Sequence, residues 1–462
     1  MKKHIAGLIL LFTVLQAVAQ NKQIIAVNTR NTTLVFSVGT NGRLYQNYFG
    51  PRLQGDITPL PKAVEAYPGA GMDFAYEPAI RVLHADGNPS TELKYQGHHE
   101  EEQADGAVLT RIELKDEVYN TRVTLCFLAY AGQDVIKGWT IIKNGEKDEV
   151  VLTNYASAML HFNGGQYWLT QFHGDWAKEM GMQEGRLTSG QKVLDSKLGT
   201  RADKYQAPEF LLTLGDKPAT ETEGNVIAAT LAWTGNFRFS FEIDPANVLH
   251  LLAGINNYAS EYHLAPDSTF TTPQFIFTYS SKGRGQASRN LHTWARNFDV
   301  LDGTKPRLTL LNNWETTGMA FNEQKLTGLF DDAKKLGVDL FLLDDGWFGN
   351  KYPRDNDKTS LGDWQPDKKK LPDGIPFLVK QATQKGLKFG IWVEPEMVNP
   401  KSELYETHPG WILKLPNRAE SYERNQLVLD LANPEVQNFV FNTIDGLFTQ
   451  NPQLAFIKWD CN

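Results

Sequence analysis

Between residues 21 and 281 the chain repeats short segments whose apolar residues alternate with polar ones or run together over strand lengths. Residues 33–38, 108–114 and 237–243 are clear cases. A period of two is typical of strands that bury one face, and helical spacing is scarce here. The pattern predicts a large antiparallel β-sandwich, and Asn144-Gly145 between two apolar runs predicts a hairpin turn.

The pattern changes near Gln286. Leu291, Trp294 and Phe298 recur at helical spacing, which predicts a helix that links two domains. From Arg307 onward, apolar strand-like runs alternate with amphipathic helical segments. The expected strands cover residues 307–311, 338–343, 387–393 and 454–459.

This alternation implies right-handed βα units and a parallel sheet. Polar residues cluster after each expected strand, and in a (β/α)8 barrel that edge is the catalytic face. A doubly wound sheet also has a crevice there, but no glycine-rich phosphate loop follows the first strand, so the first half of a TIM barrel is the better prediction. The expected organisation is a signal peptide over 1–19, a β-sandwich over 20–285, a linker helix over 286–306 and a partial barrel over 307–462.

Composition narrows the class of protein. A chain of 462 residues is too long for one core, so two or more domains are expected. The net charge of −8 and the lack of Lys/Arg clusters argue against nucleic acid as a partner. Cys126 and Cys461 are far apart in sequence, so we expect neither a zinc site nor a disulfide.

The N-terminus resembles a secretory signal peptide. Two lysines precede an apolar run from Ile5 to Leu15, and Ala17-Val-Ala19 forms a small-x-small cleavage pattern before Gln20. The run is too short for a comfortable membrane span. We therefore expect an exported protein, secreted or periplasmic.

Candidate chemistry begins at the end of the last expected strand. Lys458 and Asp460 are two apart, so they share one face of an extended strand, and Trp459 points the other way. An ionised carboxylate beside a fixed ammonium, where a strand opens onto a cleft, is suited to attack an electrophilic carbon.

Other strand ends carry carboxylates and tryptophans. Asp344 and Asp345 can accept hydrogen bonds from vicinal sugar hydroxyls, although a divalent cation is an alternative ligand. Trp314 and Trp392 suit stacking on a pyranose, with core packing as the alternative for each.

Two further charged residues have open roles. Glu394 can supply acid/base chemistry or pair with Arg424 or Lys458, and Arg424 can reach the pocket or form a surface ion pair. Together the residues predict a sugar-binding cleft with several carboxylates, for which glycoside hydrolysis by paired carboxylic acids is the natural chemistry. The residues alone do not name the sugar.

Five motifs resemble, in the same order, those of glycoside hydrolase family 36 α-galactosidases. They are LDDGWF at 343–348, LGDW at 361–364, FGIWVEPEM at 389–397, RNQLVLD at 424–430 and IKWDCN at 457–462. In addition, FHGDW at 172–176 resembles a stretch of the family's N-terminal β-domain. Taken alone, that segment also reads as a turn held by its tryptophan.

The resemblance implies a retaining hydrolase of terminal α-linked galactose, as in melibiose or raffinose. It implies no cofactor, no metal, and a homo-oligomer, often a tetramer, for the full-length protein. The implied site consists of Asp460 as nucleophile, Asp344 and Asp345 on the O4 and O6 hydroxyls, Trp314 and Trp392 as pocket walls, and Arg424 and Lys458 as donors to ring hydroxyls.

Family members continue beyond the position of Asn462 with the remaining barrel strands, a second catalytic aspartate and a small β-domain. We therefore expect that the acid/base is absent from this chain, which would be a fragment with weak activity or none. Two alternatives are a raffinose-synthase-like transglycosylase, in which a sugar takes the galactosyl group, and a non-catalytic galactoside-binding fragment.

The expectation of weak hydrolysis is checked by assaying this chain beside a full-length version on an aryl α-galactoside. Retention requires two carboxyl groups about 5–5.5 Å apart, so this chain should hydrolyse at a small fraction of the full-length rate. Comparable rates would show that the expectation is wrong. Product analysis with sucrose present separates hydrolysis from transfer.

Overall fold

The computed structural model describes residues 23–460 apart from 56, 58–62, 164 and 200–204. Contacts divide the chain into two compact units, residues 1–304 and 305–462. The predicted signal peptide and Cys461 lie outside the described residues. Within the described residues, no helix is long and apolar enough to cross a membrane.

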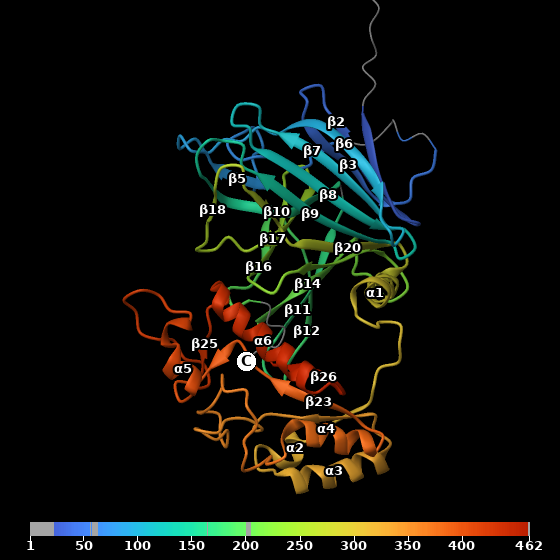
Figure 1. Ribbon diagram of the computed structural model, residues 1–462. Coiled ribbons are helices and arrows are strands. Elements are labelled where there is room, and N and C mark those ends of the chain that lie inside the picture. The colour runs from blue at the N-terminus through green and yellow to red at the C-terminus, as the bar shows by residue number, and fades with distance from the viewer. Residues whose placement is uncertain (1–22, 56, 58–62, 164, 200–204, 461–462) are drawn as a thin grey trace, which may run out of the picture. The chain divides into compact units, whose positions relative to one another are not determined.

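The first unit is built from antiparallel sheets, as the alternating pattern predicted. Figure 1 shows β6 to β9 side by side in the largest of them. A four-stranded sheet contains β1 (Ile24–Asn28), β2 (Thr32–Val38), β3 (Leu44–Pro51) and β4 (Val64–Glu65). A six-stranded sheet has the order β13 (Gly190–Asp195), β16 (Phe237–Ile243), β17 (Val248–Ile255), β10 (Val150–Asn163) and β18 (Tyr262–Leu264), with β5 (Ile80–Leu83) also on β10.

The ten-stranded sheet completes the sandwich. Its order is β12 (Gly181–Arg186), β11 (Tyr167–Gly174), β14 (Tyr205–Leu214), β15 (Asn225–Ala232), β20 (Gln274–Ser280), β9 (Val135–Lys143), β8 (Arg122–Tyr130), β7 (Val108–Lys115) and β6 (Lys94–Glu102), with β19 (Thr269–Thr271) on β9. Alternate residues of β16, Phe237, Phe239 and Phe241, are each at most 1% exposed and join one continuous core with residues of all three sheets. The period of two in the sequence thus becomes the inner layer of the sandwich.

The hairpin predicted at Asn144-Gly145 is wrong. β9 pairs with β8, β19 and β20, whereas β10 pairs with β5, β17 and β18, so the chain crosses from one sheet to the other here. The Asn144 side chain donates to the carbonyls of Asp148 and Leu264 rather than shaping a two-residue turn. A local turn signal cannot reveal that its flanking strands belong to different sheets.

The turn at residues 175–180 joins β11 to β12, which pair in an antiparallel hairpin. Trp176 is 79% exposed, so the tryptophan does not hold this turn by packing. The helix expected from residue 286 begins earlier, as α1 (Gly283–Trp294), continues as a π-helix (Ala295–Asp299), and packs on β15 and β20 of the first unit.

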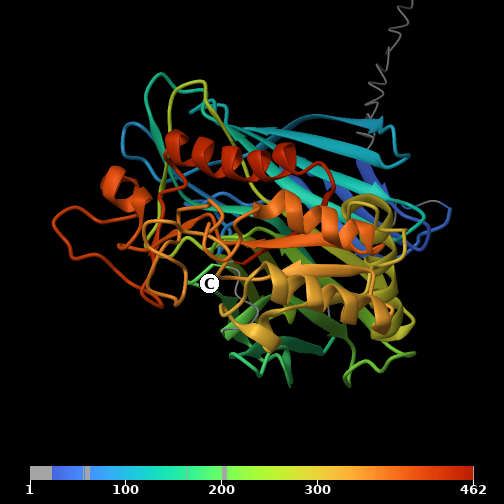
Figure 2. The same ribbon diagram turned by 60° about the horizontal axis from the view of Figure 1, so that its bottom comes forward.

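The second unit contains a parallel sheet in the order β21 (Leu310–Asn312), β22 (Leu340–Leu343), β23 (Lys388–Val393) and β26 (Leu454–Trp459). Figures 1 and 2 show α3 and α4 side by side along it. Its helices are α2 (Trp314–Thr317), α3 (Glu323–Leu336), α4 (Gly374–Gln384), α5 (Glu403–Thr407) and α6 (Pro434–Gln450), with a 3-10 turn (Pro409–Trp411). A short ribbon pairs β24 (Met397–Val398) with β25 (Leu427–Val428).

The helix boundaries carry capping residues of the ordinary kinds. Gly337 ends α3 in the left-handed region at φ 77°. Asn433 caps α6 by accepting from the Glu435 backbone N–H, and Pro434 takes the first helical position. Because the four strands of the sheet are parallel, their carboxyl ends lie at one edge of the sheet, as in a partial α/β barrel.

A buried histidine pair lies inside the first unit. Nδ1 of His161 on β10 is 2.9 Å from Nδ1 of His250 on β17, and Nε2 of His161 is 2.8 Å from the Glu65 carbonyl. Since a carbonyl only accepts, His161 carries its proton on Nε2 and accepts from His250 at Nδ1. Burial lowers the pKa of His161 to about 3 and also lowers the pKa of His250.

This pair predicts acid sensitivity of the first unit. Below pH 6.5 an unfolded histidine takes a proton, whereas folded His161 stays neutral until about pH 3. The unfolding free energy should therefore fall with decreasing pH between these values, with His161 contributing about 1.4 kcal/mol per pH unit. In scanning calorimetry at a series of pH values, His161→Asn should flatten this dependence.

His263→Asn is the matched control. His263 is half-exposed, and hydrogen bonding to Glu149 raises its pKa. Its stabilisation is present below pH 6.5 and is lost as the pH rises, so removing it should not flatten the acid-side loss. An unchanged dependence in His161→Asn would contradict the assignment.

Candidate active site

The carboxyl end of β26 presents Lys458 and Asp460 on one side, as predicted. The Lys458 Nζ lies 3.9 Å from Asp460 Oδ2. Trp459 points elsewhere, with its indole N–H donating to Glu396 at 2.7 Å. The Asp460 backbone N–H donates to the Val393 carbonyl at 2.9 Å, which extends the parallel pairing with β23 by one bond. The strand register therefore fixes the backbone position from which the Asp460 carboxylate projects.

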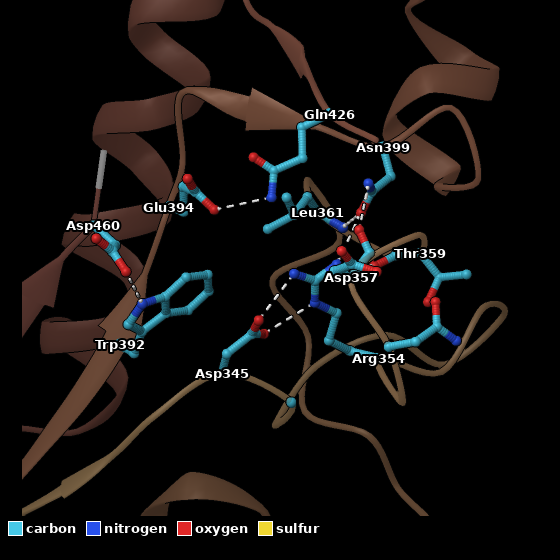
Figure 3. A network of polar contacts seen from close by, with 12 residues as sticks. Asp345, Arg354, Asp357, Thr359, Leu361, Trp392, Glu394, Asn399, Gln426 and Asp460 are labelled. Atoms are coloured by element: carbon cyan, nitrogen blue, oxygen red, sulfur yellow. Dashed lines mark hydrogen bonds and ion pairs between the residues drawn. The ribbon is translucent and has the colours of Figure 1, made fainter. Parts of the chain in front are cut away.

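Trp392 fixes the carboxylate of Asp460 from the neighbouring strand. Its indole N–H donates to Asp460 Oδ2 at 3.0 Å (Figure 3). Trp392 is only 2% exposed, and its ring packs against Phe348 and Trp364. Its expected role as a stacking wall is not supported, because its faces are covered. The ring orients the carboxylate instead.

Asp344 follows β22 and is held from three directions. Its Oδ2 accepts from Lys458 Nζ at 2.9 Å and from Asn312 Nδ2 at 2.5 Å. Its Oδ1 accepts from the Asp345 backbone N–H at 2.8 Å. Lys458 thus lies between two carboxylates that come from different strands. The ammonium and the hydrogen bonds give partners to a carboxylate that is only 5% exposed.

Asp345 has its own cation, Arg354. The two side chains form a two-bond pair, Nε to Oδ1 at 3.0 Å and Nη2 to Oδ2 at 2.9 Å (Figure 3). Gly346 follows at φ 106°, where a Cβ would lie 2.9 Å from the Cβ of Met319. Glycine is needed there both for the backbone conformation and for the close approach.

The other predicted residues occupy different settings. Trp314 opens α2 and is 40% exposed, so its ring is available for stacking on a ligand. Arg424 is exposed in the turn that joins Glu423 to Gln426, and within the described part of the chain it makes no ion pair or side-chain hydrogen bond. The structure thus does not bring Arg424 to the carboxylates. Glu394 is fully buried and accepts from Gln426 Nε2 at 3.4 Å.

The aspartate of the LGDW motif has a structural role. The two Asp363 oxygens accept from the backbone N–H groups of Glu403 and Leu404 at 2.9 and 3.0 Å, at the start of α5. Burial raises the pKa of Asp363. Sequence reasoning missed Arg354 and Asn399 as site residues, because both lie in irregular loops where no periodic pattern indicates a partner.

Three carboxylates, of Asp344, Asp345 and Asp460, therefore follow parallel strand ends and are held by Lys458, Arg354 and Trp392. Among the described residues, no cluster of three or more His, Cys, Asp or Glu side chains is arranged to hold a metal ion. The arrangement can accept hydroxyl hydrogen bonds at two carboxylates and offer a third as a nucleophile. Such strand-end carboxylates on a partial α/β barrel are typical of glycoside hydrolases.

Comparison with known proteins names the family. The Melibiase family model matches residues 269–462, and the glycosyl hydrolase family 36 N-terminal domain model matches residues 42–265. The chain belongs to glycoside hydrolase family 36.

Curated relatives are α-galactosidases. Alpha-galactosidase 1 of Pediococcus pentosaceus is 34% identical over 96% of this chain and 65% of its own length. Alpha-galactosidase AgaA of Geobacillus stearothermophilus is 33% identical over 89% of this chain and 59% of its own length. The chain thus spans less than two thirds of the length of these relatives.

Solved structures agree with the family assignment. The α-galactosidase of Lactobacillus brevis superposes with a TM-score of 0.89 at 31% identity, covering 96% of this chain and 64% of that one. A variant of Geobacillus AgaA in complex with raffinose also gives 0.89, at 30% identity, covering 95% of this chain and 65% of that one. The sheet-rich domain followed by a partial barrel therefore matches the corresponding part of these family 36 structures.

Lys458→Met tests the shared cation. The substitution leaves nearly buried Asp344 without its ammonium, and we expect the second unit to lose about 2 kcal/mol of unfolding free energy, a value reduced for the 37% exposure of Lys458. Urea denaturation at neutral pH measures this loss. Lys351→Met removes an exposed ion pair with Glu406 and should change the unfolding free energy far less. Equal effects of the two substitutions would contradict the role of Lys458.

Proposed function

We propose that this protein acts on terminal α-linked galactose as a retaining α-galactosidase, with the described site supplying the galactose contacts and the nucleophile. The observation that carries the proposal is Asp460 at the end of β26, hydrogen-bonded by Trp392 and 3.9 Å from Lys458. Family membership supports it, because the curated relatives are α-galactosidases. The activity of the whole protein is part of the proposal, since the chain spans 65% of the first relative.

Asp460 would attack the anomeric carbon of the galactosyl group. The C–O bond to the leaving group breaks as the carboxylate oxygen bonds to that carbon, and the departing oxygen takes a proton from a second carboxylic acid. Water, deprotonated by that same group, then displaces Asp460 and restores the original configuration. In the described residues the contacts of Asp460 involve Trp392, Lys458 and the Val393 backbone, which orient it and balance its charge.

Asp344 and Asp345 would recognise the hydroxyls that distinguish galactose. A carboxylate has about four lone-pair positions, and the Arg354 pair occupies two of those on Asp345. The remaining positions can accept from sugar hydroxyls. An epimer with its C4 hydroxyl equatorial would leave a buried acceptor without a partner, which corresponds to about 1–3 kcal/mol.

Exposed Trp314 would cover an apolar face of the sugar ring. Raffinose and stachyose are proposed substrates, because they are the ligands in crystal structures of Geobacillus AgaA variants. Melibiose is proposed on the same chemistry, since its terminal galactose has the same α-linkage. Export of the protein is also a proposal, based on the N-terminal sequence pattern.

Fluoride release from α-galactosyl fluoride tests the nucleophile directly. Fluoride leaves with little help from an acid, so the measurement depends mainly on attack by Asp460. We expect release above background for the chain and a decrease of at least about a hundredfold for Asp460→Asn. Asp445→Asn, on the exposed side of α6, should leave the rate unchanged. Equal rates for Asp460→Asn and the chain itself would refute the role of Asp460.

A further inference from the structure

Arg354 is enclosed by protein, unlike Lys458, the other cation that pairs with the site carboxylates. Arg354 is 1% exposed, whereas the Lys458 side chain is 37% exposed. Arg354 therefore cannot touch a sugar, but its two parallel bonds fix the plane of the Asp345 carboxylate. A single ammonium at this place would leave that plane free to rotate.

The far side of the guanidinium is held as firmly as the near side. Its Nη1 donates to the Thr359 carbonyl at 2.8 Å and to Asn399 Oδ1 at 3.1 Å. With the two bonds to Asp345, four of the five guanidinium N–H groups have partners. The direction of Arg354, and through it that of Asp345, is thus set by the loop between β22 and α4 and by Asn399.

Asn399 is a fully satisfied junction between two loops (Figure 3). Its Oδ1 accepts from Arg354 and from the Leu361 backbone N–H at 3.0 Å. Its Nδ2 donates to the carbonyls of Asp357 and Asn425 at 3.2 and 2.9 Å. All four hydrogen-bonding positions of the amide are used, and the residue is 0% exposed. The loop after β22 is thereby tied to the loop after β23.

Lys370 secures the backbone of the same loop. Its Nζ donates to the carbonyls of Gly346 and Arg354 at 2.9 and 3.0 Å. One of these carbonyls is next to Asp345 and the other belongs to its cation. Lys370 therefore holds the backbone near both members of the Asp345–Arg354 pair. The position of the Asp345 carboxylate thus depends on more than one side chain.

We propose that Arg354 and Asn399 are positioning residues that set the galactose selectivity of Asp345 without touching the sugar. The proposal rests on the proposed function, since Asp345 must contact the ligand. A carboxylate locked in one plane accepts from hydroxyls in a narrow range of directions. It therefore separates an axial from an equatorial C4 hydroxyl more sharply than a mobile one. A substitution that weakens the hold of Arg354 on Asp345 should lower the ratio of affinities for the two epimers while the chain still folds.

Calorimetric titration with two epimeric ligands tests this proposal. The probes are 1-deoxygalactonojirimycin, which is bound in one structure of a Geobacillus AgaA variant, and its C4 epimer. Arg354→Lys keeps the charge and loses the fork, and we expect the ratio of the two affinities to fall at least about tenfold. Asn399→Asp, which hardly changes the size of the side chain, should also lower the ratio. It is the variant to measure if Arg354→Lys does not fold.

Two comparisons separate positioning from stability. In an Asp345→Asn background, Arg354→Lys should cause no further loss of the ratio, whereas a merely structural role would give an additional loss. Arg43→Lys is the matched control, because Arg43 is a largely buried arginine paired with Glu65, Asp73 and Glu92 in the first unit. It should leave the ratio unchanged.

A ratio within twofold of the original in both Arg354→Lys and Asn399→Asp would overturn the inference while leaving the proposed function standing. If the unaltered chain binds neither epimer, the proposed function fails and the inference fails with it. A lower thermal midpoint with an unchanged ratio would assign Arg354 to stability alone.

Discussion

The second unit depends on holding three carboxylates in place at the ends of β22 and β26, two strands separated by β23. Unpaired, these groups would repel one another and lose hydration. The Lys458 ammonium, 2.9 Å from Asp344 and 3.9 Å from Asp460, reduces the repulsion and replaces part of the lost hydration. Asp345 instead has Arg354, which is enclosed by protein. Each carboxylate thus has a fixed partner before any ligand arrives.

Parallel pairing makes this arrangement possible. The register matches Trp392 of β23 with Lys458 of β26. The Trp392 indole therefore reaches the carboxylate that follows Lys458 by two positions. Fixed donors of this kind do not have to reorganise when charge develops during a reaction, which is how most enzymes stabilise transition states. The buried apolar strands β22 and β23 make the site rigid, and the long loops that follow them contain Arg354 and Asn399.

Much of this organisation could be predicted from the sequence because it follows local rules. The alternation in residues 237–243 became β16 with unchanged bounds, Gly337 ended α3, and the spacing of Lys458 and Asp460 placed them on one side. Each depends on backbone period or capping, which act over a few residues. The family motifs added the order of the strand-end residues.

What failed depends on contacts between distant segments. The turn at Asn144-Gly145 looked like a hairpin, yet its flanking strands joined different sheets. Spacing placed Trp392 at a strand end but could not show that Phe348 and Trp364 would cover its ring. Arg354 lies in a loop without periodicity, so nothing local indicated its pairing with Asp345.

A crystal structure of the chain with 1-deoxygalactonojirimycin tests the central claim most directly. The account predicts that ligand hydroxyls lie within hydrogen-bond distance of Asp344 and Asp345, and that Asp460 faces the position of the anomeric carbon, with the Arg354 pair unchanged. A ligand bound away from these carboxylates, or bound with Asp460 turned from that position, would contradict it.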